Sequence, residues 1–371
     1  MRERTRFMRI VNAQVILRDA VMKKASVVIE GAGIKRVCKA AATTPKDPQA
    51  IDARGCYVSS GFIDSHIHGS PGEVLSSEVE GGTTAIVSAI SCGSIDKIIR
   101  NIDLMKRFKR SSPLGPSLIG FRLEGPFINT VRAGAQNKKF ITQPSPKTLK
   151  KLLKASGGLL KIVTLAPELK GSERLAKILN KNGVIASIGH TDADYKEAVK
   201  GINSGMTHAT HLFNGMRHIA GKDPGAAFAC LKDKRVKVEV IFDLIHVRPA
   251  LLCMALAMKG SDDMILITDS VRAEMRRKSS GNGVYKLKNG TIAGSKLTMI
   301  AAVRNAVRFC GVSLKDAVAF ATINPARLLG LGRHKGSIAK GRDADLVIFD
   351  KNFDVKMTIV RGKIAYQKRG F

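Results

Sequence analysis

Short apolar segments alternate with longer amphipathic segments through the middle of this 371-residue chain. The apolar segments predict eight strands, at residues 57–66, 83–90, 116–123, 161–166, 184–189, 206–210, 236–242 and 264–268. The amphipathic segments predict helices at 94–109, 147–156, 172–182, 193–203, 248–259 and 299–310. Alternation of this kind gives parallel strands joined by crossover helices, and eight such strands close a (β/α)8 barrel. We therefore expect an α/β fold with a TIM-like barrel over residues 57–332.

The two ends of the chain have a different pattern, of short strands separated by turns. Strands are predicted at 9–18, 25–30 and 33–38, and again at 357–361 and 363–367. Such hairpin-rich ends can pair with each other, so we expect residues 1–56 and 333–371 to form one small β-sandwich domain.

Only about a dozen residues separate His68 from the second barrel strand, which predicts a short first crossover helix.

Two histidines one residue apart, His66 and His68, lie at the end of the first predicted barrel strand. Alternate side chains of a strand share a face, so both imidazoles point the same way. Neutral imidazoles bind zinc or ferrous iron. Two polar residues on an edge strand are the alternative, but the rest of the strand is apolar, which favours a metal site.

Four more polar residues follow later predicted strands: Glu124, His190, His211 and Asp269. The carboxyl ends of barrel strands meet on one face, where such barrels carry their active sites. Glu124 could bind or bridge a metal, or could pair with Arg122. Asp269 is suited to a general base that takes a proton from the attacking water, with a helix N-cap as the alternative.

His208 lies three residues before His211. In a continuous strand that spacing aims the two side chains at opposite faces, so we interpret His208 as a structural residue.

Charge and cysteine content argue against a nucleic-acid site, a disulfide framework and zinc fingers. The chain has 62 basic and 30 acidic residues, a net charge of +32, with the basic residues scattered along it. A general solvated surface explains scattered charge better than a nucleic-acid site does, because there is no Trp and there are only 4 Tyr for base stacking. The six cysteines share no CxxC spacing, which predicts buried free thiols rather than disulfides or zinc fingers. No membrane span or signal peptide is predicted, so we expect a cytoplasmic protein.

The chain resembles the N-acetylglucosamine-6-phosphate deacetylases of the amidohydrolase superfamily. The matching motifs are GFIDSHIHG at 61–69, LEGPF at 123–127, GHTD at 189–192, ATHLFNGM at 209–216, ITD at 267–269 and AGSKLTM at 293–299. NPA at 324–326 and KGRDADL at 340–346 are general to the superfamily. The resemblance spans nearly the whole chain with the motifs in the right order.

The resemblance implies a role for each site residue. It implies that Glu124, His190 and His211 hold the main catalytic metal, and that His66 and His68 can bind a second one. Zinc is the first expectation for a divalent ion, with iron, manganese or cobalt as alternatives. Asp269 matches the catalytic acid/base, and the substrate phosphate is expected near Asn214, Gly215 and His246.

The sequence shows three departures from the family pattern. Gln136 replaces a histidine that positions the acetamide carbonyl; glutamine can donate a hydrogen bond but cannot be cationic. Lys222 replaces an arginine that reaches the phosphate from the neighbouring subunit of a homodimer, and lysine lacks the bidentate fork. Leu244 and Ile245 replace smaller residues before His246.

The predicted reaction is metal-dependent hydrolysis of the acetamide of N-acetylglucosamine 6-phosphate. One alternative is a deacetylase of another N-acyl amino sugar, nucleotide-linked or unphosphorylated. A cyclic-amide hydrolase is disfavoured by the LEGPF motif and by the lack of a strand-end lysine suited to carboxylation. A basic protein that binds nucleic acid non-specifically, with residual activity, is the alternative from another class.

Overall fold

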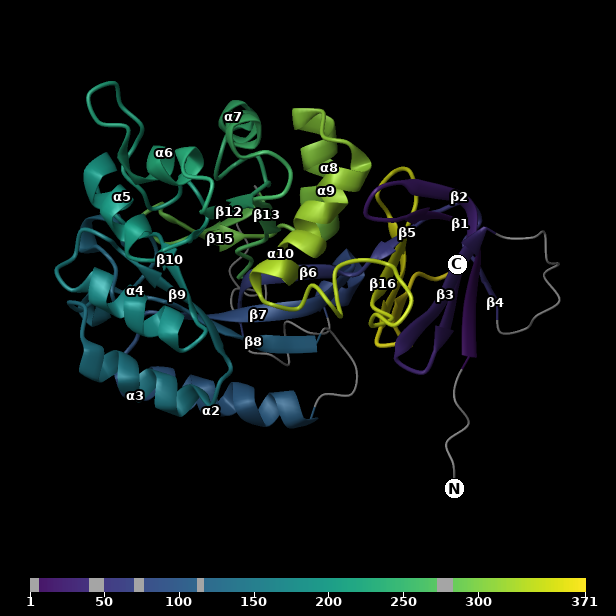
Figure 1. Ribbon diagram of the computed structural model, residues 1–371, viewed down its shortest axis with the longest axis horizontal. Helices are drawn as coiled ribbons and strands as arrows, with labels where there is room; N and C mark the ends of the chain where they lie inside the picture. Colours follow the sequence, from purple (N-terminus) through teal and green to yellow (C-terminus); the bar gives the residue numbers. More distant parts are fainter. Residues whose placement is uncertain (1–6, 40–49, 70–76, 112–116, 272–282) are drawn as a thin grey trace.

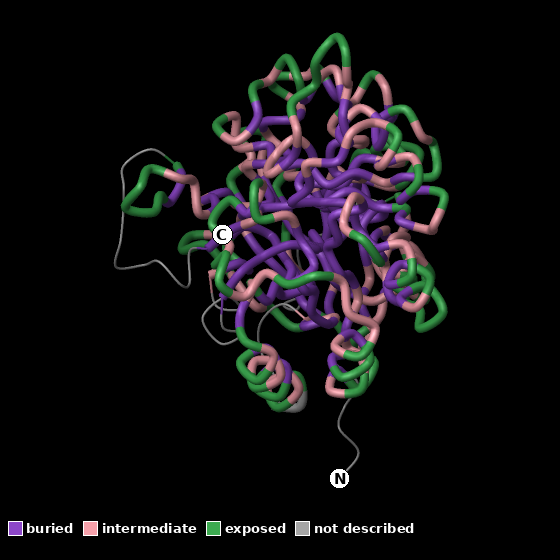
Figure 2. The backbone as a smooth tube through the Cα atoms, turned by 90° about the vertical axis from the view of Figure 1, so that its left-hand side faces the viewer, coloured by how far each residue is buried: buried purple, intermediate pink, exposed green. Residues whose placement is uncertain are grey.

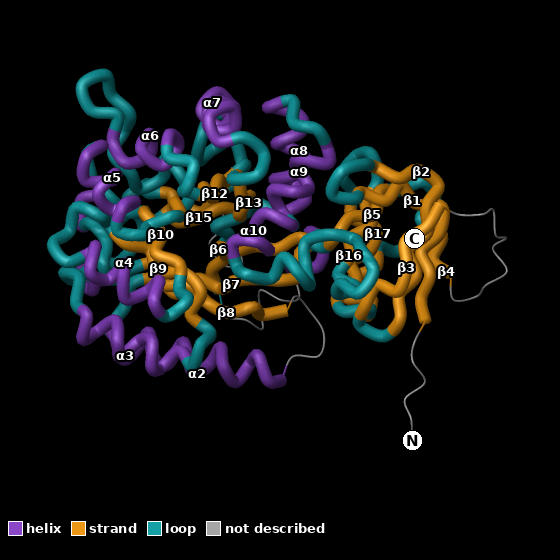
Figure 3. The backbone as a smooth tube through the Cα atoms, viewed as in Figure 1, coloured by secondary structure: helices purple, strands orange, loops and turns teal. Residues whose placement is uncertain are grey.

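The chain forms two bodies, a barrel ringed by helices and a separate small β-sheet that contains the first and last strands (Figures 1 and 3). The structure is a computed structural model and describes residues 7–39, 50–69, 77–111, 117–271 and 283–371. Buried residues fill the centre of the barrel, whereas exposed residues lie mainly on the outer helices and loops (Figure 2). No helix in these ranges is both long and apolar enough to cross a membrane.

Eight parallel strands make the barrel. They are β6 (Phe62–His68), β7 (Thr83–Ser91), β8 (Ser117–Glu124), β9 (Leu160–Leu165), β10 (Ile185–Ile188), β11 (His208–Ala209), β12 (Lys237–Ile241) and β13 (Met264–Ile267). Each pairs with its sequence neighbour. The ring closes just beyond β13, where the Asp269 amide donates to the His66 carbonyl at 2.9 Å and the His68 amide donates to the Ser270 carbonyl at 2.8 Å. The predicted (β/α)8 fold is confirmed.

Helices cover the outside of the barrel. They are α2 (Ile95–Ser111), α3 (Pro146–Ser156), α4 (Ser172–Lys181), α5 (Tyr195–Asn203), α6 (Gly225–Lys232), α7 (Pro249–Lys259), α8 (Met299–Cys310), α9 (Leu314–Ala321) and α10 (Ile323–Leu328). Six were predicted. The sequence missed α6 because almost all of its residues are buried, which removes the amphipathic period, and α9 and α10 because they are short. Between β6 and β7 the described residues include two helical residues, 77 and 78, which lead into a 3-10 turn, Val79–Gly81. The predicted short first helix otherwise falls on residues 70–76, which lie outside the described ranges.

The small domain is one continuous hydrogen-bonded sheet built from both ends of the chain. Its strands are β1 (Phe7–Ile16), β2 (Val21–Glu30), β3 (Gly33–Lys39), β4 (Ala50–Asp52), β5 (Tyr57–Ser60), β16 (Leu346–Phe349), β17 (Val355–Val360) and β18 (Lys363–Gln367). Their order is β18-β17-β16-β5-β1-β2-β3, with β4 beside β1. The N- and C-terminal strands meet where β16 pairs antiparallel with β5. The core of this sheet consists of aliphatic and methionine side chains.

The first predicted barrel strand, 57–66, is in fact two strands in different sheets. β5 pairs with β1 and β16 in the small sheet, and β6 pairs with β7 in the barrel. The break is at Gly61, where an added Cβ would lie 2.2 Å from the Thr84 Cγ2 atom, so only glycine fits. The sequence could not show this break because both halves are apolar. The small sheet therefore extends to Ser60, past the expected boundary at residues 56 and 57.

One disulfide corrects the expectation of free thiols. Cys253 on α7 and Cys310 on α8 are bonded, with their Cα atoms 5.2 Å apart, although 57 residues separate them in sequence. Packing of α7 beside α8 brings the two together, and no local pattern reports such packing. The other four cysteines are free, Cys230 buried and Cys38, Cys56 and Cys92 half-buried.

Candidate active site

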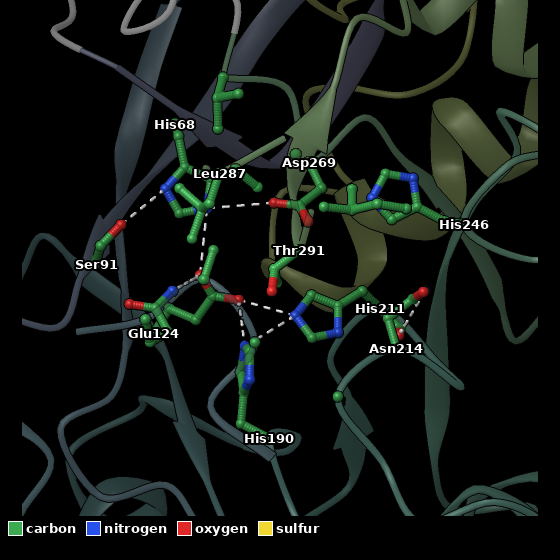
Figure 4. Close-up of a pocket in the computed structure, with 18 residues that line it drawn as sticks. His68, Ser91, Glu124, His190, His211, Asn214, His246, Asp269, Leu287 and Thr291 are labelled. Atoms are coloured by element: carbon green, nitrogen blue, oxygen red, sulfur yellow. Dashed lines mark hydrogen bonds and ion pairs between the residues drawn. The ribbon is translucent and has the colours of Figure 1, made fainter. Parts of the chain in front are cut away.

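The predicted metal ligands and the predicted base converge at the carboxyl ends of the barrel strands. Figure 4 shows five of them, His68, Glu124, His190, His211 and Asp269. His66 and His68 lie on β6 and Glu124 ends β8, whereas His190, His211 and Asp269 come two residues after β10, β11 and β13. These last three have φ angles of 48°, 29° and 47°, in the left-handed region that non-glycine residues seldom adopt. The chain therefore turns sharply at each of them, at a conformational cost of about 1–3 kcal/mol per residue.

Glu124, His190 and His211 form one compact group of potential ligand atoms. The Glu124 Oε1 atom lies 3.0 Å from His190 Nε2 and 2.8 Å from His211 Nε2. The two Nε2 atoms are 3.2 Å apart. All three side chains are buried. One carboxylate oxygen and two imidazole nitrogens, all within 4.8 Å of one another, can hold a single divalent ion.

His66, His68 and Asp269 form a second group of the same kind. The Asp269 Oδ1 atom lies 3.2 Å from His68 Nε2 and 3.5 Å from His66 Nε2. Glu124 stands between the groups, because its Oε1 is 3.5 Å from His66 Nε2 and its Oε2 is 3.2 Å from His68 Nε2. The structure thus brings together all six residues that the sequence analysis selected from the strand ends.

The electrostatics of the site keep both carboxylates ionised. Burial raises the pKa of Glu124, but the positive charge of His66 and hydrogen bonds from His190 and His211 hold it well below its usual value. Burial also acts against the charged forms of Asp269 and His68. The charge of His66 nevertheless lowers the pKa of Asp269, and the two carboxylates raise the pKa of His68 well above its usual value. Anionic oxygens in a buried site favour a positive charge between them, which protonated imidazoles or a divalent metal can supply.

Several histidine nitrogens are oriented by neighbours that the sequence analysis did not identify. The Ser91 Oγ atom lies 3.2 Å from His68 Nδ1, and the Arg132 carbonyl oxygen lies 2.8 Å from His190 Nδ1. These contacts occupy the outer nitrogens and leave both Nε2 atoms facing the centre of the site. Backbone and hydroxyl partners of this kind have no sequence signature, because they depend on residues far apart in the chain.

An unpartnered nitrogen supports a metal here. Among the described residues, the Nε2 atom of His66, which faces the two ligand groups, is buried and has no hydrogen-bond partner. Buried polar atoms without partners are unusual and call for an explanation such as an ion. The donor set of imidazoles and carboxylates suits zinc, iron, manganese or cobalt. The residues present therefore fit a divalent metal.

Gln136 lies in the pocket and contacts Glu124. Its Nε2 atom donates to Glu124 Oε2 at 2.6 Å, and its Oε1 accepts from the Cys92 amide at 2.7 Å. Both ends of the carboxamide are therefore held. Because an amide carries two N–H groups, one donor remains for a ligand in the pocket.

A pocket of about 440 Å³ opens above the two groups of ligands. Its wall consists of His68, Ser91, Glu124, Gly134, Ala135, Gln136, His190, His211, Asn214, Gly215, His246, Asp269, Val271, Leu287, Thr291, Ile292, Ala293 and Gly294. The last five come from the hairpin of β14 (Val284–Lys286) and β15 (Ile292–Ser295), which the sequence analysis did not predict. A volume of this size accommodates a small molecule. No lysine or arginine is among the described residues that line it.

The expected phosphate residues divide between the pocket and the surface. Asn214, Gly215 and His246 line the pocket (Figure 4). Asp243 Oδ2 lies 2.6 Å from His246 Nδ1, which leaves Nε2 to contact a ligand. Lys222 is exposed, in the loop before α6, and does not line the pocket of its own chain.

The two residues before His246 also stay out of the pocket wall. Leu244 has a φ of 68°, and Ile245 is 41% exposed. This departure from the family pattern therefore makes no direct contact with the pocket.

The structure rules out one alternative from the sequence and changes one expected orientation. Arg122 pairs with Glu239, at 2.6 Å between Nη1 and Oε1, and not with Glu124. His208 lies outside both ligand groups, but it faces the barrel interior, where its Nδ1 is 2.9 Å from Ser187 Oγ. The expected opposite face does not apply because β11 ends at Ala209 and the chain turns before His211.

Comparison with known proteins agrees with this geometry. A model of the Amidohydrolase family matches residues 57–365. The chain is 35% identical to N-acetylglucosamine-6-phosphate deacetylase of Bacillus subtilis (strain 168), over 95% of each chain. Among relatives from animals, the enzyme of Bos taurus is 30% identical over 85% of each chain.

Solved structures of the same group superpose on nearly the whole chain. The N-acetyl-D-glucosamine-6-phosphate deacetylase of Mycobacterium smegmatis, a mutant in complex with N-acetyl-D-glucosamine-6-phosphate, aligns with a TM-score of 0.87 and 30% identity. That alignment covers 97% of this chain and 100% of the other. The enzyme of Pasteurella multocida aligns with a TM-score of 0.87 and 25% identity, over 98% and 100%.

Proposed function

This chain belongs to the amidohydrolase family, among its N-acetylglucosamine-6-phosphate deacetylases, and we propose that it hydrolyses the acetamide of N-acetylglucosamine 6-phosphate to glucosamine 6-phosphate and acetate. The observation that carries the proposal is the convergence of Glu124, four histidines and Asp269 on one point beneath a sugar-sized pocket. A buried cluster of metal ligands with an adjacent carboxylate is suited to hydrolysis of a carbon–nitrogen bond.

In this proposal Glu124, His190 and His211 hold the main metal ion, and His66 and His68 take part in holding a second. A bound divalent ion of this kind supplies Lewis acidity, which lowers the pKa of water and polarises an amide carbonyl. Zinc suits the imidazole-rich donor set best, and iron, manganese and cobalt share the same ligands.

Asp269 is the proposed general base and acid. Its side chain lines the pocket and is ionised, so it can accept a proton when water attacks the acetamide carbon. As the carbon–nitrogen bond breaks, the same carboxyl gives that proton to the leaving amine of the sugar. Its position beside His68 and His66 keeps the carboxylate at the centre of the site.

Gln136 and the residues around His246 bind the substrate at its two ends. The free N–H of the Gln136 amide donates to the carbonyl oxygen, where negative charge develops. Asn214, Gly215 and His246 face the other part of the pocket and contact the phosphate. Since no described lysine or arginine lines the pocket, we assign the further positive charge to Lys222 of a partner subunit in a homodimer.

The test is acetate release from N-acetylglucosamine 6-phosphate by the purified, metal-reconstituted protein, with unphosphorylated N-acetylglucosamine in parallel. We expect strong preference for the phosphorylated sugar. In Asp269→Asn we expect loss of turnover while the ion held by Glu124, His190 and His211 is retained. Full turnover by Asp269→Asn would disprove the assignment of the base. Absence of acetate from both sugars, with metal bound, would disprove the substrate.

A second candidate is deacetylation of a different N-acyl amino sugar, nucleotide-linked or unphosphorylated. It is favoured by the absence of lysine and arginine from the described pocket wall and by Gln136 in place of a histidine. Equal or faster turnover of the unphosphorylated sugar would select this candidate.

A further inference from the structure

A fully buried ion pair lies in the barrel interior next to the candidate metal site. Arg122 on β8 and Glu239 on β12 both have side chains with 0% exposure. Arg122 Nη1 lies 2.6 Å from Glu239 Oε1. The two strands are not neighbours in the barrel, so the pair spans its interior. We refer to Arg122 and Glu239 as the interior ion pair.

The interior ion pair contacts residues that directly precede two of the proposed ligands. Arg122 Nη1 donates to the Ser65 carbonyl at 3.2 Å, and Nη2 donates to Thr210 Oγ1 at 2.9 Å. The Ser65 hydroxyl donates to Glu239 Oε1 at 3.0 Å. Because Ser65 precedes His66 and Thr210 precedes His211, these bonds hold the strand ends that carry the ligands.

The second oxygen of Glu239 faces His66 directly. Glu239 Oε2 lies 3.4 Å from His66 Nδ1, and among the described residues neither atom has a hydrogen-bond partner. On the opposite side of the ring, His66 Nε2 lies 3.5 Å from Glu124 Oε1 and 3.5 Å from Asp269 Oδ1. The imidazole therefore stands between an interior carboxylate and the metal-ligand groups.

A buried ion pair contributes little to the stability of a fold. Removing two charges from water costs several kcal/mol per ion, and apolar residues of similar volume often serve the fold as well or better. The interior ion pair lies next to the Nδ1 atom of His66, which has no hydrogen-bond partner among the described residues. This position indicates a different role. Carboxylates that accept the outer N–H of a ligating histidine fix its tautomer and orientation.

We propose that Glu239 is a positioning residue for His66. Glu239 Oε2 accepts the hydrogen bond from His66 Nδ1–H, which directs the lone pair of Nε2 into the site, and Arg122 holds Glu239 in place. The inference rests on the proposed function only in requiring that the group of His66, His68 and Asp269 binds a divalent ion. It does not depend on which sugar is the substrate.

Two double variants isolate the accepting oxygen. In R122M/E239Q the arginine charge is gone and residue 239 can still accept a hydrogen bond, whereas in R122M/E239M it cannot, at almost the same side-chain size. We measure zinc and cobalt(II) affinity and stoichiometry of the intact protein by competition with a chromogenic chelator. We expect the methionine variant to bind one equivalent roughly 10–100-fold more weakly than the glutamine variant. Equal affinities of the two would overturn the proposal.

A third comparison shows whether the effect passes through His66. The same two double variants are made with His66→Asn, and the difference in metal affinity between them should disappear. A difference that persists without His66 would also overturn the proposal. As the matched control, K335M/D345M removes the buried ion pair of the small domain, whose side chains are 10% and 4% exposed. That variant should keep wild-type metal affinity, whatever it does to stability.

A measurement on the wild-type protein tests the hydrogen bond directly and uses a variant only to assign the His66 signal. Long-range nitrogen–proton NMR of the metal-loaded, ¹⁵N-histidine-labelled protein reports the tautomer of each ring, with His66 assigned from His66→Asn. The proton is expected on Nδ1; a proton on Nε2 would refute the proposed hydrogen bond. Since neither readout uses turnover, failure to release acetate leaves this result intact, and an active enzyme with equal variant affinities refutes only the inference.

Discussion

The small sheet and the barrel differ in how many ionisable groups they bury. The core of the small sheet consists of aliphatic and methionine side chains from both ends of the chain, and the same domain holds the ion pair of Lys335 and Asp345. The barrel buries many more ionisable groups on and next to its strands, among them Asp64, His66, Arg122, Glu124, His208 and Glu239. Burying charged groups costs free energy that apolar packing does not, so the barrel sacrifices stability at the place where ligand binding is proposed.

Backbone conformation separates the two regions in the same way. In the small sheet, Asn12, Lys24, Arg54 and Arg361 have positive φ angles and are exposed, as in ordinary turns. In the barrel, His190 and His211 have positive φ angles and are buried. Strained backbone that is held by surrounding structure is concentrated at functional sites. The comparison teaches that the small sheet is built for stability and the strand ends of the barrel for a site.

The largest expected effect is from Glu124→Gln, which keeps size and removes the charge that both ligand groups face. Loss of metal-dependent stabilisation of about 4 kcal/mol corresponds to a roughly thousandfold lower kcat/KM. Metal content by mass spectrometry and acetate release measure both consequences. Glu173→Gln, at a half-exposed carboxylate on α4, is the control and should change neither. Wild-type metal content in Glu124→Gln would contradict the ligand assignment.

Truncation of one isoleucine in each region tests whether the small sheet serves stability alone and the barrel serves both stability and the site. Ile348 in the small sheet and Ile267 in the barrel are both 0% exposed. Each change to alanine should lower the free energy of unfolding by about 2–5 kcal/mol. Only Ile267→Ala should also lower kcat, because Ile267 leads into Asp269. Denaturant unfolding and acetate release are the measurements, and an equal loss of kcat in Ile348→Ala would break the comparison.

The pH dependence of stability should also originate in the barrel. Burial lowers the pKa of His208 to about 4, while Glu239 and Arg122 act in opposite directions on it. Between pH 6.5 and 4 the unfolded chain therefore binds more protons than the folded one at this position, so stability falls as the pH falls. The contribution is about 1.4 kcal/mol per pH unit. His208→Gln should flatten the acid limb of the unfolding free energy by that slope.

The control for this prediction is His218→Gln, at an exposed histidine in the loop before α6. It should leave the slope unchanged. An acid limb of the same steepness in His208→Gln and wild type would place the titrating group elsewhere in the molecule.

The features that the sequence predicted correctly, the barrel strands and the polar residues that follow them, are visible in short stretches of the chain. Apolar runs with polar ends located all eight barrel strands and placed Glu124, His190, His211 and Asp269 correctly at their ends. Apolar pattern alone could not separate β5 from β6, because both are apolar and the break between them falls at the single residue Gly61. The helix α6 was missed for the same reason, since a helix buried on all sides has no amphipathic period.

Contacts between residues far apart in the chain could not be predicted from local sequence pattern. Arg122 and Glu239 are 117 residues apart, so the sequence offered only the nearby Glu124 as a possible partner for Arg122. The bond from Gln136 to Glu124 and the disulfide between Cys253 and Cys310 likewise depend on folding of the intervening chain. Such long-range pairs decide how a ligand is oriented, whereas local pattern decides only that it is present.

The smallest expected effect is at Gln136, which supports Glu124 and does not belong to either ligand group. Gln136→Met removes a charge-assisted hydrogen bond, worth about 1.5–3 kcal/mol when fully formed. Part of that loss is expected in kcat/KM, a decrease of roughly tenfold. Gln136→His keeps a donor for Glu124 and should lose less. Gln14→Met is the matched control, because Gln14 donates to the Gly55 carbonyl at 2.8 Å in the small sheet. If Gln14→Met slows acetate release as much as Gln136→Met does, the effect reflects general stability, and the contrast between the two regions does not hold at this position.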